Sequence, residues 1–367
     1  MKIVYCIDSL IPSGGTERVL TTKLNYLAET ENIKVWVVTL SENKPSFFTI
    51  SEKVERIMLD VNCGDKRTYR RELEILLSDL CPDITVCVDG MALNVLPKLT
   101  DGSVKVLEFH YTKNFLVNFV KGIHSIRFRQ LHLLKMRWFQ WQLAQIAKKY
   151  KCFVGLTKRD VDLWGTPKNM AYIYNPLSFR SERKSTCDNH QIIAVGSLTP
   201  AKGMDQLIEA FGRIAHRYPD WKLDIYGDGQ DKKLLLSIIV KYAITEQVTL
   251  HKPCRNIKEK LLESSIYAFP SRSDGFGLVI TEAMECGLPT VAMDCECGPC
   301  EILSSSSGIL VPDKNIEAFT SALEQLMNDN ILRKTMGNTA QKEVIRFYPE
   351  NIMPQWINLF KSLVIKD

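Results

Sequence analysis

Two acidic residues eight positions apart, Asp274 and Glu282, flank a glycine-rich turn in the run SRSDGFGLVITEAMECG. The apolar run IYAFPS before the turn predicts a buried strand, and the residues from Leu278 onward predict a helix. N–H groups in the first turn of a helix have no intrahelical acceptor and lie at the positive end of the helix dipole. The turn therefore predicts an anion site with a carboxylate on either side. A diphosphate between two polyhydroxyl groups, as in a nucleotide-sugar, fits that arrangement.

A lysine follows another predicted strand, in the run VGSLTPAKG that holds Gly196, Ser197 and Lys202. The loop places Lys202 directly before a helix predicted at 204–217. An ammonium group there is a compact charge well suited to phosphate. By itself, a lysine at a helix start is more often solvated.

The first predicted strand is followed by the run SGGTE, in which Gly14 and Gly15 open a helix. Glycines let the backbone approach a ligand closely, and a helix N-terminus offers free N–H groups to an anion. The pattern is not the dinucleotide fingerprint G-x-G-x-x-G. A tight turn that binds nothing explains the two glycines equally well.

Each of these loops joins a short apolar run to a longer amphipathic stretch, and the same alternation continues through the chain. The predicted strands are KIVYCI, VWVVTL, ITVCVD, KVLEF and CFVGLT, and then QIIAVGS, WKLDIYG, QVTLHK, IYAFPS and PTVAMD. The predicted helices are 17–30, 70–80, 204–217, 231–242, 257–263, 278–286 and 350–364. This α/β order predicts parallel sheets with helices on both faces.

The alternation stops in the polar stretch 176–190 and then restarts, which predicts a linker between two domains. We expect residues 1–178 to form one doubly wound domain and residues 191–345 a second. Residues 346–367 are expected to form a C-terminal helix that crosses back to the first domain. Ligands of such folds bind at the carboxyl ends of the strands, so two domains in tandem predict a cleft between two such edges.

The composition excludes several classes of protein. The 367 residues are 45% apolar and 24% charged, which is typical of globular rather than disordered or fibrous chains. No apolar run approaches the ~18 residues that span a bilayer. MKIVYCIDSL makes a poor signal peptide because Asp8 interrupts its short apolar stretch. We therefore interpret the eleven cysteines as reduced thiols in a reducing compartment.

Two patterns could hold a metal. Cys295, Cys297 and Cys300 form C-x-C-x-x-C, but no second ligand pair at zinc-finger spacing accompanies them, which favours a cysteine-rich loop. The one D-x-D, Asp160-Val161-Asp162, falls at a predicted helix start, where the helix dipole favours acids. We expect no metal and no cofactor.

The net charge of +5 is uneven, because residues 1–178 carry +7 and the stretch Lys113–Lys151 holds nine Lys or Arg and no acid. Seven aromatic residues are interleaved there: Phe115, Phe119, Phe128, Trp138, Phe139, Trp141 and Tyr150. Such a stretch suits an anionic membrane surface or nucleic acid. The rest of the chain has no nucleic-acid-reading motif, so we expect a membrane surface and no nucleic acid. The alternative is core packing of residues at near-helical spacing, namely Phe128, Leu131, Leu134 and Trp138.

The chain resembles glycosyltransferase family 4 over essentially its whole length. The resemblance rests on Gly14-Gly15-x-Glu17, the G-x-L-x-x-x-K-G loop from Gly196 to Gly203, the E-x7-E-type segment from Asp274 to Glu282, and Gly298-Pro299-x-Glu301. It implies the GT-B fold, with two Rossmann-like doubly wound domains facing a cleft. It also implies retaining transfer of a sugar from a nucleotide-sugar, with the first domain on the acceptor side and the second binding the donor.

Carried over by position, the resemblance implies catalytic roles for individual residues. Lys202 would neutralise the donor diphosphate, Glu282 would accept hydrogen bonds from the ribose hydroxyls, and Asp274 would hold hydroxyls of the transferred sugar. His110, in Glu108-Phe109-His110 after a predicted strand, would lie in the cleft near the donor sugar. Further donor contacts would come from Gly14, Gly15, Gly196, Ser197, Cys254, Gly275, Phe276, Gly277, Leu278 and Val279.

Two residues depart from the family pattern. Asp274 stands in place of a glutamate and is one methylene shorter, and Ser197 stands where many members have an arginine. The phosphate charge then falls more heavily on Lys202, on helix N-termini or on another base such as Arg272. The nucleobase is expected near 251–254, through backbone groups.

These observations predict an enzyme, a hexosyl- or N-acetylhexosaminyl-transferase with a UDP-linked donor. It would extend a lipid-linked glycan acceptor in surface polysaccharide synthesis, without a metal, as a peripheral protein on the cytoplasmic face of a membrane. Two alternatives stay open. One is a sugar-nucleotide epimerase or phosphorylase on a similar scaffold, and the other is a non-enzymatic membrane-binding module built on Lys113–Lys151.

Overall fold

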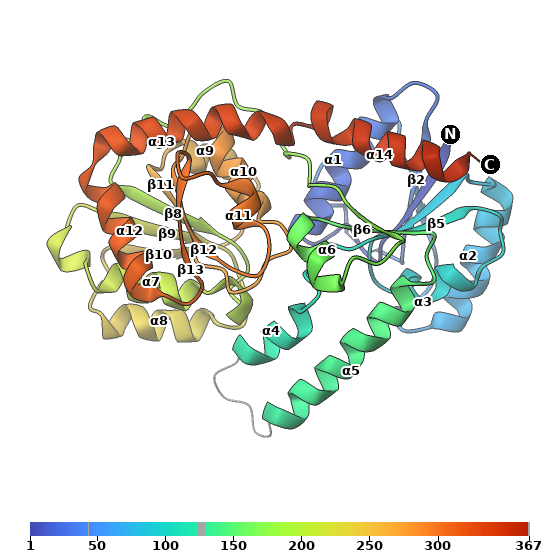
Figure 1. The fold of residues 1–367 in the computed structure, drawn as a ribbon, viewed down its shortest axis with the longest axis horizontal. Helices are drawn as coiled ribbons and strands as arrows, with labels where there is room; N and C mark the ends of the chain where they lie inside the picture. Colours follow the sequence, from blue (N-terminus) through green and yellow to red (C-terminus); the bar gives the residue numbers. More distant parts are fainter. Residues whose placement is uncertain (43, 123–128, 366–367) are drawn as a thin grey trace. The chain divides into compact units, whose positions relative to one another are not determined.

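The computed structural model describes residues 1–42, 44–122 and 129–365 of the chain. These residues form two compact α/β units (Figure 1). The first unit consists of Met1–Lys113, Trp138–Ser178 and Phe347–Asp367, and the second of Asn114–Arg137 and Phe179–Arg346. Each unit has its own parallel sheet, so the predicted α/β class is confirmed.

Within the described ranges, the first unit has a seven-stranded sheet with the order β3-β2-β1-β4-β5-β6-β7. Its strands are β1 (Lys2–Cys6), β2 (Lys34–Thr39), β3 (Glu55–Met58), β4 (Ile84–Cys87), β5 (Val104–Glu108), β6 (Cys152–Gly155) and β7 (Met170–Tyr172). The central strands are buried on both faces, which explains their continuous apolar runs. The edge strands β3 and β7 were not predicted, because both are short and largely solvated.

The second unit has a six-stranded parallel sheet, counted over the same described residues, with the order β10-β9-β8-β11-β12-β13. Its strands are β8 (Gln191–Val195), β9 (Lys222–Tyr226), β10 (Val248–His251), β11 (Ile266–Phe269), β12 (Thr290–Asp294) and β13 (Gly308–Pro312). Only β13 was not predicted. Only Gly308 and Val311 of this strand are buried, and it lies at the edge of the sheet.

Helices connect these strands. The α-helices are α1 (Gly15–Glu29), α2 (Lys66–Leu80), α3 (Ala92–Val95), α4 (Phe115–Gly122), α5 (Arg129–Ala147), α6 (Lys158–Trp164), α7 (Met204–Gly212), α8 (Lys232–Lys241), α9 (Ile257–Leu262), α10 (Leu278–Glu285), α11 (Pro299–Ile302), α12 (Ile316–Asn328), α13 (Asn330–Glu343) and α14 (Pro349–Val364). Short 3-10 turns are η1 (Leu96–Lys98), η2 (Pro200–Lys202), η3 (Ala215–Arg217) and η4 (Val344–Phe347). The helix predicted at 204–217 is α7 followed by η3.

The C-terminal helix α14 belongs to the core of the first unit. Its Trp356 and Phe360 are at most 1% exposed, and they pack in one cluster with Leu20 and Leu24 of α1. Burying an aromatic side chain of this size contributes roughly 1.5–3 kcal/mol. α14 therefore fixes α1, the helix that begins at Gly14-Gly15.

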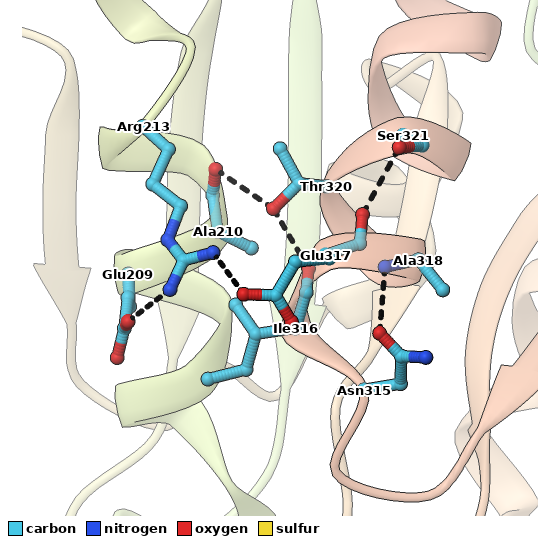
Figure 2. Close-up of polar contacts among 9 residues, drawn as sticks. All are labelled: Glu209, Ala210, Arg213, Asn315, Ile316, Glu317, Ala318, Thr320 and Ser321. Atoms are coloured by element: carbon cyan, nitrogen blue, oxygen red, sulfur yellow. Dashed lines mark hydrogen bonds and ion pairs between the residues drawn. The ribbon is translucent and has the colours of Figure 1, made fainter.

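Helix α7, which follows the Lys202 loop, is fixed against α12. Arg213, the residue after α7, donates to Glu209 of α7 and to Glu317 of α12, each at 2.7 Å (Figure 2). Asn315 caps α12 by accepting from the N–H of Ala318 at 2.9 Å. The buried faces of both helices join the hydrophobic core of the second unit. Helix α7, which follows Lys202 in the chain, is thus held by the hydrophobic core of the second unit and by the Arg213 ion pairs at the surface.

The predicted linker 176–190 contains no helix or strand, and this whole stretch is described. It nevertheless packs on the second unit. Ser185 and Cys187 are buried, and the N–H of Ser185 donates to the backbone oxygen of Cys286 at 2.8 Å. Most of the stretch is therefore an ordered strap on the second unit rather than a free tether.

Candidate functional site

Lys202 and Asp274 follow two neighbouring strands of the second sheet. β8 and β11 pair in parallel, Lys202 ends η2 after β8, and Asp274 lies in the turn after β11. The strand order reverses between these strands, since β9 and β10 continue on one side and β12 and β13 on the other. Ligands of open α/β sheets bind in the crevice at such a point. The fold brings two predicted site residues together there.

The two side chains form an ion pair. Nζ of Lys202 lies 2.5 Å from Oδ2 of Asp274, and the side chains are 28% and 16% exposed. Oδ1 of Asp274 accepts from the N–H groups of Phe276 at 3.2 Å and Gly277 at 3.0 Å. Burial would raise the pKa of Asp274, but Lys202 and the two N–H donors outweigh it and hold the pKa below its usual value. Asp274 is therefore an ionised carboxylate that orients Lys202.

The turn before α10 is tightly packed. Gly277 has a φ of +94° and precedes Leu278 and Val279, the first two residues of α10. Phe276 is 1% exposed, and a Cβ on Gly298 would lie 2.1 Å from its backbone oxygen. Gly275 is half-buried. The N–H groups of Phe276 and Gly277, which were predicted to face a donor, donate to Asp274 in this structure.

The lysine loop is held by close backbone contacts. Gly203 has a φ of +63°, and a Cβ there would lie 2.1 Å from the backbone oxygen of Pro270, at the end of β11. A Cβ on Gly196 would lie 3.3 Å from Cε of Met204, in α7. Ser197 bonds within its own loop, its hydroxyl lying 3.3 Å from that of Thr199. These contacts fix Lys202 against the neighbouring strand.

Arg272, a predicted candidate for phosphate binding, has a different partner. Its guanidinium donates to both carboxylate oxygens of Asp205, at 2.7 and 2.6 Å, and to the backbone oxygen of Pro200 at 3.0 Å. Its backbone N–H donates to Ala201. A bidentate pair of this kind is strong and directional. Arg272 therefore clamps the Lys202 loop to β11 in this structure, and its role toward phosphate stays a prediction.

Glu282 lies in α10 and is fully buried. Its charge and that of Asp274 both act on Tyr267 of β11, whose pKa is raised well above its usual value chiefly by burial and then by these two carboxylates. The structure thus places both predicted acids around one buried tyrosine. Glu282 is inside the fold, one helical turn behind the N-terminus of α10.

The region predicted for the nucleobase begins where β10 ends. The ring of His251 stacks on Tyr226 with centroids 4.4 Å apart, and its Nε2 lies 2.9 Å from Oδ1 of Asp224. Cys254, three residues further on, is half-buried. The ring of His251 thus covers that of Tyr226, which is buried at the end of the neighbouring strand β9.

The remaining predicted residues belong to the first unit. Gly14 caps α1, and a Cβ there would lie 2.4 Å from Oε2 of Glu17, whereas Gly15 adjoins open space. The pKa of Glu17 is raised above its usual value, and burial is the main cause. His110 follows β5 with a side chain 3% exposed, and its Nε2 lies 3.0 Å from Oε1 of Glu108. Glu17 and Asp89 both interact electrostatically with His110.

The candidate metal ligands have structural partners. Cys295 and Cys297 are fully buried, and Glu296 between them accepts from Asn114 and, at 2.9 Å, from Asn118. The D-x-D lies in α6 as predicted, where Asp160 accepts from the N–H of Lys113 at 2.8 Å. In the described part of the chain, no three His, Cys, Asp or Glu side chains gather as a metal site.

The basic segment Lys113–Lys151 includes α4 and α5, while Arg127 and Phe128 lie outside the described residues. Leu131, Leu134, Trp138 and Trp141 of α5 are 66%, 61%, 53% and 60% exposed. Their spacing of three or four residues places them along one helix face. The alternative that Leu131, Leu134 and Trp138 pack in the core is therefore wrong, although Tyr150 is buried.

Over the same described residues, none of the helices combines the length and apolar character required to cross a bilayer.

Comparisons with known proteins agree with this architecture. Residues 178–343 match the family model described as glycosyl transferases group 1. An uncharacterized glycosyltransferase of Haemophilus influenzae is 28% identical over 372 residues, which cover 97% of this chain and 98% of that protein. The amylovoran biosynthesis glycosyltransferase AmsD of Erwinia amylovora is 28% identical over 365 residues, with coverage of 97% and 98%. The structure of an S. aureus TarM mutant in complex with fondaparinux, alpha-GlcNAc-glycerol and UDP has a TM-score of 0.80 at 16% identity and covers 98% of this chain and 100% of that chain.

The chain is therefore an enzyme, a glycosyltransferase with the GT-B fold. The predicted fold class and enzyme class are confirmed, and the non-enzymatic module is excluded. The group 1 match supports the family resemblance at that level, while family 4 and the retaining mechanism stay predictions.

Sequence reasoning missed two ionic contacts, one in each unit. The partner of Arg272, Asp205, is 67 residues away in the sequence, and no local pattern connects them. Lys23, which contacts Glu108 in the first unit, looks like an ordinary helix-surface lysine in the sequence. The proximity of Glu108 to His110 could have been predicted, because residues two positions apart in an extended chain lie on the same face.

Proposed function

We propose that this enzyme transfers a sugar, with retention of anomeric configuration and without a metal, from a UDP-sugar to a lipid-linked glycan acceptor. The observation that carries the proposal is the Lys202–Asp274 pair between the ends of β8 and β11. A cation held beside the N-terminus of a helix, at the switch point of a parallel sheet, is a site for a diphosphate.

In this proposal Lys202 neutralises the diphosphate. Asp274 exchanges its contact with Lys202 for contacts with hydroxyls of the transferred sugar, and the N–H groups at the start of α10 then face the phosphates. The ammonium group and the helix dipole stabilise the negative charge that develops on the leaving diphosphate. The rest of the rate enhancement comes from holding the donor and the acceptor in the geometry required for transfer.

Retention follows if the acceptor hydroxyl attacks from the face that the diphosphate leaves. The leaving diphosphate takes the proton of that hydroxyl, so no enzyme nucleophile is required. Glu282 accepts hydrogen bonds from the ribose, and His110 contacts the donor sugar. The half-buried loop at Cys254 and the Tyr226–His251 stack lie near the base.

The names of similar proteins support the choice of donor and acceptor. AmsD is named for amylovoran biosynthesis, which is consistent with a role in surface polysaccharide synthesis. The TarM structure contains UDP and alpha-GlcNAc-glycerol, which favours a UDP-linked hexose or N-acetylhexosamine.

The exposed face of α5 supports membrane binding. Its apolar stripe is accompanied by the exposed cations Lys135 and Arg137. In such a helix the aromatic side chains enter the lipid interface while lysine and arginine contact anionic head groups, at ~1 kcal/mol each. We place the enzyme as a peripheral protein on the cytoplasmic face of a membrane, where a lipid-linked acceptor is within reach.

The test is release of nucleotide from UDP-, GDP- and ADP-sugars by purified enzyme, in the presence and absence of EDTA, with the anomer of the released sugar followed by NMR. We expect UDP release that survives EDTA, with the α-anomer appearing first from an α-linked donor. The matched variants are Lys202→Ala and Lys334→Ala, since Lys334 pairs with Asp188 on the exposed surface. Only Lys202→Ala should lose activity.

Each part of the proposed function can be overturned by a different result of this experiment. A preference for GDP- or ADP-sugars overturns the donor assignment, and loss of activity in EDTA that Mg²⁺ or Mn²⁺ restores overturns metal independence. Early β-anomer overturns retention. Sugar phosphate formed from inorganic phosphate, or an epimerised nucleotide-sugar, indicates the phosphorylase or epimerase alternative instead.

A further inference from the structure

Helix α4 lies beside the lysine of the candidate site. The stretch Asn114–Arg137, which contains α4, belongs to the second unit, although the chain before and after it belongs to the first. α4 lies against η2, the turn that ends at Lys202. Val117 of α4 is buried, and Phe115 and Leu116 are half-buried. The helix therefore packs through apolar side chains rather than extending into solvent.

The first turn of α4 is held by a carboxylate from another loop. Glu296 lies just after β12, and its two carboxylate oxygens accept from the side-chain amides of Asn114 and Asn118, the latter at 2.9 Å. The two asparagines are four positions apart, so they lie on the same face of the helix. Hydrogen bonds to a charged acceptor are stronger than those between neutral groups. These three side chains form a latch that ties α4 to the loop after β12.

The two contacts of α4 lie on opposite sides of Asp274. The second sheet has the order β8-β11-β12, so η2 follows one neighbour of β11 and Glu296 follows the other. Neighbouring strands are about 4.8 Å apart, which places β8 and β12 about 10 Å apart. A helix of eight residues is about 12 Å long and can cross that distance. α4 therefore crosses the carboxyl end of β11, where Asp274 and the start of α10 lie.

We propose that α4 is a cover over the diphosphate site and that the latch holds this cover closed. A nucleotide-sugar then enters or leaves only when Glu296 releases the two amides. A closed cover of apolar side chains excludes water from Lys202, and an ammonium group attracts a diphosphate more strongly in such a site than in water. This inference rests on the proposed function, which places the diphosphate beside Lys202.

The direct test is stopped-flow measurement of the binding of fluorescently labelled UDP to the full chain. N118D places a second carboxylate beside Glu296, and the repulsion between like charges opens the latch. We expect the association and dissociation rate constants both to rise roughly tenfold, because a closed cover slows entry as well as exit. Loss of a contact with the nucleotide would raise only the dissociation rate constant. E296A, which removes both acceptors, should behave as N118D does.

The matched rescue is E296Q/N118D. The new amide keeps one oxygen that accepts from Asn114 and gains an N–H that donates to the introduced carboxylate, so both hydrogen bonds of the latch are restored. Both rate constants should then return to wild-type values. E324Q is the control, since Glu324 is a half-buried carboxylate of α12 that accepts from the O–H of Tyr218 at 2.8 Å. It should change neither rate constant.

These kinetics can overturn the proposal at two points. An association rate constant that neither N118D nor E296A raises would show that α4 is not a cover. Rate constants that stay high in E296Q/N118D would show that the latch does not hold it.

Amide hydrogen exchange separates this inference from the proposed function, because it requires no nucleotide. In the free protein α4 should exchange roughly tenfold faster in N118D than in the wild type or in E296Q/N118D, while the central strand β8 stays equally protected in all three. Equal exchange of α4 in all three overturns the latch. Absence of UDP binding by the wild type overturns the donor assignment and the nucleotide cover with it, whereas exchange still decides the latch.

Discussion

At the scale of single residues, the site depends on how each charge is held. Asp274 is an ionised acid near the surface, fixed by Lys202 and two backbone N–H donors. Glu282 is a fully buried acid of the same region. Two carboxylates in different environments can serve different partners. We assign the ribose to Glu282, and the transferred sugar to Asp274.

Glu282→Gln is expected to lower kcat/KM for transfer roughly tenfold or more, because loss of a charge-assisted hydrogen bond costs about 1.5–3 kcal/mol. The matched control is Glu285→Gln in the same helix, where the remaining carbonyl can still accept from the N–H of Ser181, the present partner of Glu285. Steady-state kinetics with a nucleotide-sugar measure both. Equal kcat/KM for the two variants would contradict the role of Glu282.

Asp274 should make the stability of the fold depend on pH. Its pKa in the folded protein is below the usual 3.8, so its contribution is present above about pH 4 and is lost as the pH falls through the folded pKa. The difference in Tm between the wild type and Asp274→Asn is therefore expected to be larger at about pH 6 than at about pH 3. A difference that is the same at both pH values would show that the carboxylate is not stabilised by folding.

Some site residues could be predicted from a short stretch of sequence around them, and others could not. Lys202 and Asp274 each follow a strand at short range, so the sequence could place both at the same edge of the sheet. The clamp of Arg272 on Asp205 and the contact of Lys23 with Glu108 join residues 67 and 85 apart, and neither has a local pattern. Long-range ion pairs of this kind follow from the fold and not from spacing.

At the scale of elements, buried strands were predictable and edge strands were not. The central strands are apolar on both faces, so their composition identifies them. β3 (ERIM) and β7 (MAY) are short, polar or solvated, and carry no such signal. α5 shows a different difficulty, because an apolar stripe at helical spacing looks the same in sequence whether it packs in a core or faces solvent.

Helix α5 is expected to bind vesicles that contain anionic lipid, and to bind them less at high salt. Trp138→Ser with Trp141→Ser removes apolar contacts, whereas Lys135→Glu with Arg137→Glu reverses charge, and each pair should reduce co-sedimentation. Leu236→Ser with Val240→Ser is the matched control, since both residues are exposed on α8 of the second unit. Equal binding by all variants would leave α5 without a membrane role.

At the scale of the whole molecule, two parallel sheets are each built from a nearly continuous half of the chain. The second carries Lys202, Asp274 and Glu282, and the first carries His110 and the Gly14-Gly15 turn. The α/β alternation was sufficient to predict both sheets. The assignment of α14 to the core of the first unit depends on Trp356 and Phe360, whose cluster partners in α1, Leu20 and Leu24, lie more than three hundred residues earlier in the chain.

The central claim is that Lys202 binds the diphosphate of a nucleotide-sugar, and titration of UDP by calorimetry tests it most directly. We predict that Lys202→Ala raises the Kd for UDP roughly tenfold or more relative to the wild type, because a charge-assisted contact worth about 1.5–3 kcal/mol is lost. Lys334→Ala should leave the Kd unchanged. The same Kd for UDP in the wild type and in folded Lys202→Ala would contradict the claim.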